Sequence, residues 1–332
     1  MLSHGSGGSM MHNLIKDLFF NYFNNPLLNL ANDSAIFPSF KGLTAFTTDS
    51  FVVDPIFFPG GDIGKLAVCG TINDLVAVGA QPYCLSAGFI IEEGFPLNDL
   101  ETIVSSMATE AAKAGIFIVT GDTKVVEKGK CDKLFINTSG IGVLPGDKTR
   151  QPNPESIGAG DQIIITGCIG DHGMAVMAAR NHLEGTINIQ SDCAPLNLLL
   201  HGITENPGGI KCMRDPTRGG VASSLCELVK DKEFGITIHE DRIPVKPAVK
   251  GFCDMLGFDP LYVANEGKML IFANKEKSED IVARLKSHPL GREACCIGEV
   301  NRENHGKVVM KTAIGGTRVV GMLSGDQLPR IC

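Results

Sequence analysis

The stretch over residues 145–160, PGDKTRQPNPESIGAG, is the feature that most limits how this chain can fold. It is dense in proline, glycine and charge, which makes it a poor place for a helix or strand and a good place for a domain boundary. A chain of 332 residues is also too long for one compact core. We therefore predict a glycine-rich segment and helix over 1–34, a first domain over 35–150, a second over 151–313, and a flexible tail over 314–332.

Similar elements are predicted on both sides of this boundary. Apolar runs indicate strands over 43–53, 116–120 and 162–166, and helices over 62–78 and 167–180. The strand over 116–120 is predicted to stop at Gly121-Asp122. Strands that alternate with helices indicate an α/β fold class.

Composition excludes several classes of protein. The net charge of −7, without a long basic run, argues against nucleic acid as the main partner. No apolar run approaches the ~20 residues that span a bilayer, and the first residues lack the pattern of a secretory signal. Eleven cysteines, an odd number without a C-x-x-C pair, indicate reduced thiols in the cytoplasm and no zinc site.

Three glycine-rich segments could bind phosphate. Gly5-Ser6-Gly7-Gly8 offers backbone N–H groups, and a disordered N-terminus is the alternative. Asp215–Gly220 (DPTRGG) is predicted to begin a helix, with Asp215 as N-cap and Pro216 at the first position, and Arg218 adds donors. An ordinary capped helix explains that segment equally well. Gly167–Gly173 (GCIGDHG) is a strand-to-helix turn in which tight packing is the alternative.

Three acidic residues of the first domain stand in or beside apolar segments. They are Asp49, Asp74 and Asp122. Each alone is more often a cap or a turn residue, but buried carboxylates are costly unless they are paired or bind metal. Together, and with Lys124 two residues after Asp122, they suit a site for magnesium and a triphosphate.

Cys332, the last residue, is the strongest single indication of function. It follows a tail that contains Pro329 and Arg330, whereas Cys69, Cys84, Cys168 and Cys226 stand in apolar settings typical of a core. A tethered thiol can carry a substrate into a nearby pocket, and Arg330 would favour the thiolate. The alternative is an incidental terminal thiol.

These motifs resemble the HypE family of carbamoyl dehydratases, which act in NiFe-hydrogenase maturation and belong to the AIR synthetase (PurM-like) ATP-binding superfamily. The resemblance runs from end to end, through His4–Gly8, Thr48–Ser50, Cys69–Asp74, Gly79-Ala80, Gly121–Val126, Gly170–Gly173, Arg214–Gly220, Glu266–Lys268 and Pro329–Cys332. Two positions depart from the pattern: Asn265 stands where we expect a smaller residue, and Cys168 where Thr or Ser is more usual.

The resemblance implies a PurM-like fold of two domains, with an N-terminal sheet domain that dimerises, a C-terminal α/β sandwich and ATP between them. It implies that a HypF-type carbamoyltransferase loads a carbamoyl group on Cys332. The chain would then convert this group to a thiocyanate with ATP, and the cyanide would pass to a HypC–HypD complex and on to iron.

The site residues follow from the same resemblance. The catalytic group is Cys332, with Glu266 and Lys124 as bases, the latter only if its surroundings lower its pKa. ATP would be held by Gly5, Gly7, Gly8, Asp49, Asn73, Asp74, Asp122, Arg218, Gly219 and Gly220, and Mg²⁺ by Asp49, Asp74 and Asp122.

Two kinds of rival remain. One is a sister enzyme such as selenophosphate synthetase, thiamine-phosphate kinase or AIR synthetase. The first wants a reactive residue near the N-terminus, but no cysteine precedes Cys69, and the others have no use for a terminal cysteine. The second rival is a carrier that holds a modified thiol and uses the nucleotide only as a signal.

Overall fold

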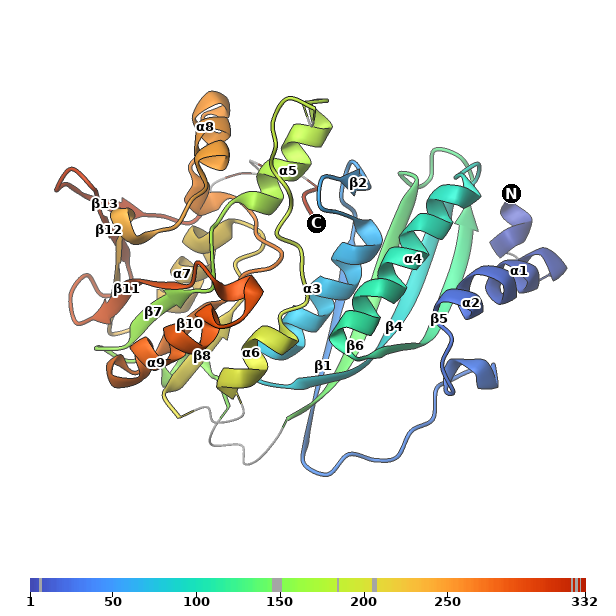
Figure 1. Cartoon of the computed structure of the whole chain (residues 1–332), viewed down its shortest axis with the longest axis horizontal. Helices are drawn as coiled ribbons and strands as arrows, with labels where there is room; N and C mark the ends of the chain where they lie inside the picture. The colour runs from blue at the N-terminus through green and yellow to red at the C-terminus, as the bar shows by residue number, and fades with distance from the viewer. Residues whose placement is uncertain are drawn as a thin grey trace.

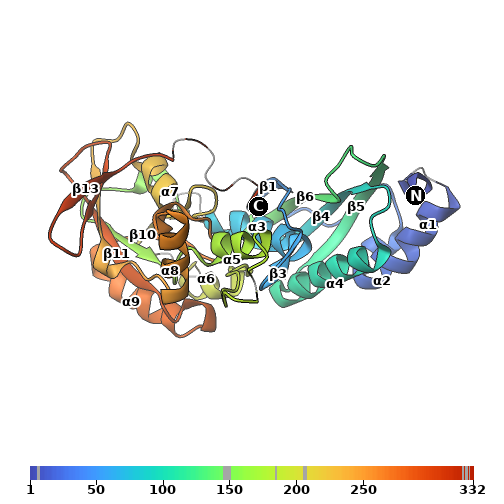
Figure 2. The ribbon, with the colours of Figure 1, turned by 90° about the horizontal axis from the view of Figure 1, so that it is seen from above.

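The computed structural model describes residues 1–5, 8–144, 151–183, 185–204, 208–323, 325, 328 and 330–332. Two β-sheets with helices packed on them lie side by side along the long axis of the molecule (Figure 1 and Figure 2). The four-stranded sheet has the order β1-β6-β4-β5, and the seven-stranded sheet the order β13-β12-β9-β11-β7-β10-β8. The predicted α/β fold class is confirmed.

The four-stranded sheet is covered on one face by two helices. Its elements are β1 (Leu43–Phe51), α3 (Ile63–Ala77), β4 (Gln81–Glu92), α4 (Leu97–Ala114), β5 (Phe117–Val126) and β6 (Leu134–Leu144), and a small ribbon of β2 (Phe57–Phe58) and β3 (Gly61–Asp62) precedes α3. The strand predicted over 43–53 and the helix predicted over 62–78 are confirmed.

Helix α3 is central to the molecule. Asp62 caps it by accepting hydrogen bonds from Gly64 N and Lys65 N at 2.7 and 3.1 Å. A side chain at Gly64 would lie 2.5 Å from Ile103 O, so glycine allows α4 to approach closely. Most of α3 is buried, which explains why its sequence is apolar on all sides.

The other face of this sheet carries no helix among the described residues. Phe46 and Ile90 are exposed there, by 69% and 45%. Asp122 and Lys124 point to the same face, because Asp122 pairs with Gly88 and Lys124 with Ile90. The prediction that the strand stops at Gly121-Asp122 is wrong, since β5 continues beside β4 up to Val126.

The second domain is built on the seven-stranded sheet. Its elements are η5 (Pro154–Ser156), β7 (Gln162–Ile165), α5 (Asp171–Arg180), α6 (Asn197–Thr204), β8 (Ile210–Arg214), α7 (Gly220–Val229), β9 (Gly235–His239), η6 (Glu240–Arg242), α8 (Pro247–Leu256), η7 (Pro260–Tyr262), β10 (Leu270–Ala273), α9 (Lys275–Lys286), η8 (Pro289–Gly291), β11 (Cys295–Asn301), β12 (Val308–Lys311) and β13 (Thr317–Val320). Helix α7 contacts β9 and β12, and α9 contacts β7 and β11.

Two predicted boundaries in this domain are corrected. Helix α7 begins at Gly220 with Gly219 as its N-cap, so Asp215 is not a cap and Pro216 lies before the helix. Gly219 and Gly220 both have positive φ, of 74° and 60°, and this turn delays the helix. The free tail also begins later than residue 314, because β13 pairs with β12 at the edge of the sheet.

The N-terminal segment is helical, as predicted. It comprises η1 (Leu2–Gly5), α1 (Ser9–Leu14), the π-helical turn η2 (Ile15–Phe19), α2 (Phe20–Tyr22) and η3 (Leu28–Leu30). This segment packs against β5 and α4, at the end of the molecule farthest from the second sheet (Figure 1).

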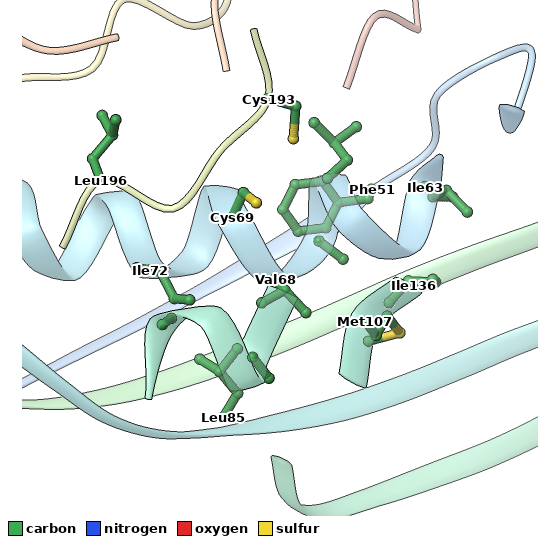
Figure 3. Close-up of a cluster of buried hydrophobic side chains, with 14 of the residues drawn as sticks. Phe51, Ile63, Val68, Cys69, Ile72, Leu85, Met107, Ile136, Cys193 and Leu196 are labelled. Carbon is green, nitrogen blue, oxygen red and sulfur yellow. The ribbon is translucent and has the colours of Figure 1, made fainter. Parts of the chain in front are cut away.

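One apolar core joins the two domains. Phe51 of β1 and Cys69 of α3 lie near Cys193 and Leu196 of the segment that follows α5 (Figure 3). Ile331, from the C-terminal tail, belongs to the same core. None of the helices over the described ranges combines the length and apolar character needed to cross a bilayer.

Candidate active site around the terminal cysteine

The last residues of the chain run beside residues 52–54. Val52 N donates to Cys332 O at 3.2 Å, and Asp54 N donates to Arg330 O at 3.1 Å. Ile331 is only 3% exposed. We had expected an unpacked tail, but burial of Ile331 anchors it and places Cys332 at a cavity of about 220 Å³.

The Cys332 thiol is held in its neutral form. Burial raises its pKa to about 12, the nearby Glu266 carboxyl adds to this effect, and Arg218 opposes it. The expectation that Arg330 is the cation beside the thiol is wrong. Arg330 pairs instead with Asp132 and donates through Nε to Val52 O at 3.0 Å.

Glu266 has the properties expected of a general base. It is 3% exposed, and burial raises its pKa well above the ordinary value, helped by Cys193 and Asp215. Within the described part of the chain, its Oε1 has no hydrogen-bond partner. A buried carboxyl that is free to exchange a proton suits a general base.

The loop that carries Glu266 is fixed from several sides. Asp192 accepts from Glu266 N and Gly267 N, both at 3.2 Å, and pairs with Lys268 at 3.1 Å. Asn73 donates to Glu266 O and to Ala194 O at 3.1 Å and accepts from Leu196 N at 2.8 Å. All polar atoms of the Asn73 side chain are therefore engaged within the protein, where they position Glu266.

The contacts of Asn265 explain why this residue departs from the family pattern. Its amide accepts from Gly170 N at 2.8 Å and donates to Pro216 O and Val263 O at 3.0 Å. A smaller side chain could not join these three segments. Asn265 thus ties the loop before α5 and the loop before α7 to the Glu266 loop.

Three carboxylates gather where the two domains meet, two from the first domain and one from the second. They are Asp49, Asp74 and Asp215. Burial raises the pKa of all three. The Asp215 pKa reaches about 6, through burial first and then through the charges of Asp74 and Asp49. Asp74 accepts from Thr47 Oγ1 at 2.9 Å and Asp49 from Ser50 N at 2.7 Å. Asp215 was missed as a site residue because the preceding Arg and following Pro make it resemble a helix cap.

The turn that contains Arg218, Gly219 and Gly220 faces this cluster. Arg218 lowers the pKa of Asp49 as well as that of Cys332. A side chain at Gly219 would lie 2.2 Å from Ser223 Oγ, and one at Gly220 would lie 2.5 Å from Leu261 O. The glycines are therefore required by packing and by positive φ, and they place Arg218 at the start of α7.

The remaining predicted residues form a second group at the β5 edge. Gly5 lies against Val125, and a side chain there would be 2.3 Å from Val125 N. Gly8 caps α1, and Gly7 lies outside the described residues. Lys124 pairs with Asp122 at 2.5 Å, and this contact lowers the Asp122 pKa. We call Gly5, Gly8, Asp122 and Lys124 the β5-edge group.

The predicted metal triad is not assembled within one chain. Asp49 lies on β1 and Asp122 on β5, at opposite edges of the sheet, roughly 14 Å apart across three strand spacings. They also face opposite sides, because Asp49 shares a face with Gly121 and not with Asp122. Among the described residues, no three His, Cys, Asp or Glu side chains are arranged to hold a metal ion. By the same geometry, Lys124 does not reach Cys332 of its own chain.

Comparison with known proteins identifies the family. Models of the N- and C-terminal domains of AIR synthase related proteins match residues 31–144 and 158–311. The chain is 48% identical over its whole length to the carbamoyl dehydratase HypE of Bradyrhizobium diazoefficiens, of which it covers 95%. It is also similar to a crystal structure of the hydrogenase maturation protein HypE in complex with ATP, with a TM-score of 0.95, 46% identity and coverage of 100% of this chain and 99% of that one. A HypE–HypF complex matches with a TM-score of 0.81 and 48% identity, over 93% of this chain and 99% of that one. The chain belongs to the HypE family of carbamoyl dehydratases.

Proposed function

We propose that this chain uses ATP to dehydrate an S-carbamoyl group on Cys332 to an S-cyanate, a thiocyanate that supplies cyanide ligands for the iron of NiFe-hydrogenase. One observation carries the proposal: the tail is anchored so that Cys332 lies at a cavity of about 220 Å³, where the Glu266 carboxyl raises its pKa. A carboxyl with a raised pKa is thus close enough to the atom that would carry the substrate to raise the pKa of that atom.

The balance of the reaction defines what the site must do. The carbamoyl carbon loses its oxygen, and the nitrogen loses two protons as the C≡N bond forms. ATP would supply the phosphoryl group that lets the oxygen leave as phosphate. Glu266 would take a proton from the nitrogen, and Arg218, whose charge lowers the pKa of Cys332, would face developing negative charge.

Mg²⁺ and the nucleotide phosphates fit the carboxylate cluster. Asp49, Asp74 and Asp215 offer oxygen ligands, and burial raises the pKa of all three. Magnesium accepts few protein ligands and completes its shell with water and phosphate. Asp49 and Asp74 would hold the cation, and the turn with Arg218, Gly219 and Gly220 would face the phosphates.

We also propose that the active form is a homodimer that buries the helix-free face of the first sheet. This face exposes Phe46 and Ile90, and covering these apolar side chains would stabilise the dimer. A two-fold axis through its middle would bring the β5 edge of one copy to the β1 edge of the other. Asp122 and Lys124 of one copy would then lie at the β1 edge of the partner copy, next to the strand that carries Asp49.

The partners follow from the same chemistry. A HypF-type carbamoyltransferase would load Cys332, and a HypC–HypD complex would accept the cyanide. The eleven cysteines are all unpaired, which favours a reducing compartment such as the cytoplasm.

Mass spectrometry of the C-terminal peptide tests the proposal. After loading by a HypF-type enzyme, addition of ATP and Mg²⁺ should remove the mass of one water molecule from the peptide that ends in Cys332. Cys332→Ala should give no product while it keeps the fold and ATP binding. Product on another cysteine would refute the carrier assignment, and loading without ATP consumption would favour the non-catalytic carrier.

A further inference from the structure

We propose that His172 is a positioning residue for this reaction: through a hydrogen bond to the Ile331 carbonyl it sets the depth at which Cys332 is presented to Glu266. The proposal rests on the proposed function for its consequence in catalysis. It concerns His172 of the Gly170–Gly173 motif, a side chain for which the site described above has no role.

His172 lies in the first turn of α5 and is completely buried. Its Nε2 is 2.8 Å from Ile331 O, and its Nδ1 is 2.8 Å from Ser191 Oγ. The Phe58 ring contacts the imidazole edge to face, at 5.3 Å between centroids. These three contacts hold the imidazole with Nε2 directed at the tail.

The partners fix the tautomer. A carbonyl oxygen only accepts, so Nε2 carries the proton and donates to Ile331 O. Nδ1 then accepts from the Ser191 hydroxyl, whose oxygen in turn accepts from Cys193 N at 3.1 Å. Burial lowers the His172 pKa, which keeps the ring neutral and this arrangement intact.

At its other end, α5 binds the carbonyl of Arg330, the residue before Ile331. Arg180 Nη2 donates to Arg330 O at 3.0 Å, and Arg180 Nε donates to Asp54 O at 2.9 Å. Helix α5 thus binds two successive backbone carbonyls of the tail, those of Arg330 and Ile331. Because both hydrogen bonds are to the backbone, they can form whether Cys332 carries a thiol, a carbamoyl or a cyanate group.

This geometry makes a specific demand on the reaction. The carbamoyltransferase needs Cys332 outside, whereas dehydration needs it beside Glu266 and away from water. Only an interaction made in the inward state can raise the population of that state. The bond from His172 is such an interaction, because Ile331 O leaves it when the tail moves out.

Labelling of Cys332 in the full-length protein tests the proposal without nucleotide or carbamoyl donor. The rate of maleimide addition to the C-terminal peptide is followed by mass spectrometry in wild type, His172→Leu, His172→Gln and the control His182→Leu, which changes an exposed histidine just beyond α5. We expect His172→Leu to label about tenfold faster, as the loss of one buried hydrogen bond implies. His172→Gln, which keeps a donor near the Nε2 position, should stay within about threefold of wild type, and the control should not change.

Single-turnover dehydration of preloaded protein gives the second readout. His172→Leu should slow it about tenfold while loading by the carbamoyltransferase stays unchanged. Equal labelling of Cys332 in His172→Leu and wild type would overturn the proposal, as would a glutamine variant that behaves like leucine. If the leucine variant does not fold, Ser191→Ala replaces it, and unchanged labelling there is contrary evidence. Failure of wild type to dehydrate would refute the proposed function and leave the labelling result to judge His172.

Discussion

The two groups of predicted site residues are built in opposite ways. Around Cys332, carboxyl groups are buried, share few hydrogen bonds and have raised pKa values. In the β5-edge group, Asp122 and Lys124 are 62% and 57% exposed in their side chains and neutralise each other. The first group is formed within one chain, and the second is an exposed surface that the proposed dimer would cover.

This difference shows how the cost of a site is distributed. Buried, unpaired carboxyls destabilise the fold, and they persist where a ligand or substrate relieves them. Exposed ion pairs cost little and contribute little until a second surface removes them from water. Variants in the first group should therefore change chemistry and stability together, whereas those in the second should change activity alone.

Glu266→Gln should have the largest effect. Removal of the base should lower single-turnover dehydration about 10²- to 10⁴-fold, while loading of Cys332 is unchanged. Rapid-quench mass spectrometry measures both steps, with Glu279→Gln, an exposed residue of α9, as the control. Dehydration within a few-fold of wild type would remove Glu266 from the chemistry.

Complementation between copies tests whether the β5-edge group acts across a dimer. Glu266→Gln and Lys124→Met should each be inactive alone. Subunits mixed in equal amounts, then exchanged, should regain about one quarter of wild-type activity, because half of the dimers would hold one intact site. No recovery, with exchange shown by native mass spectrometry, would indicate that Lys124 serves its own chain or no chain.

Asp74→Asn should weaken Mg²⁺-dependent ATP binding by about tenfold to a hundredfold, through loss of a charged ligand. The melting temperature of the free protein should not fall, since the variant removes a buried charge whose pKa is raised. Titration calorimetry with and without Mg²⁺ measures the effect, and Asp33→Asn is an exposed control. Unchanged ATP affinity would count against the metal role of this cluster.

Asp215→Asn should show the smallest effect, and its sign depends on pH. The Asp215 pKa is raised to about 6 in the folded state, so the folded state holds this proton more tightly than the unfolded state. The cost of the ionised carboxyl is therefore complete above pH 6 and disappears as the pH falls toward 4. The variant should be more stable than wild type by roughly 1 kcal/mol at pH 8 and equal to it at pH 4. Chemical denaturation at both values, with the exposed Asp254→Asn as control, measures the difference; a less stable variant at pH 8 would contradict it.

The sequence predicted the elements well where one local signal decided them. The strand over 43–53 and the helix over 62–78 follow apolar patterns that survive folding unchanged. Asp215 was misassigned because a cap signal cannot show that two glycines with positive φ delay the helix to Gly220. The tail was misjudged because Pro329 and Arg330 indicate exposure, while one buried side chain, Ile331, decides the position.

The sequence indicated many of the residues of the site, but not which of them lie close together. Asp49, Asp74 and Asp122 all look alike in sequence, as acids within apolar segments. Asp74 lies on helix α3, whereas the face of the sheet that Asp49 and Asp122 occupy depends on register, and a shift of one residue moves a side chain to the opposite face. His172 was visible only as part of a glycine motif, because its partner, the Ile331 carbonyl, lies 159 residues away.

The placement of β13 in the second sheet sets the length of the arm that carries Cys332. Twelve residues follow Val320, the last residue of β13, and such a segment spans at most ~40 Å when fully extended. Any enzyme that loads or unloads this cysteine must therefore bring its own catalytic centre within that radius of the sheet edge. Within the radius, the tether keeps its cargo at a local concentration on the order of millimolar, so a weak and brief encounter is enough for transfer.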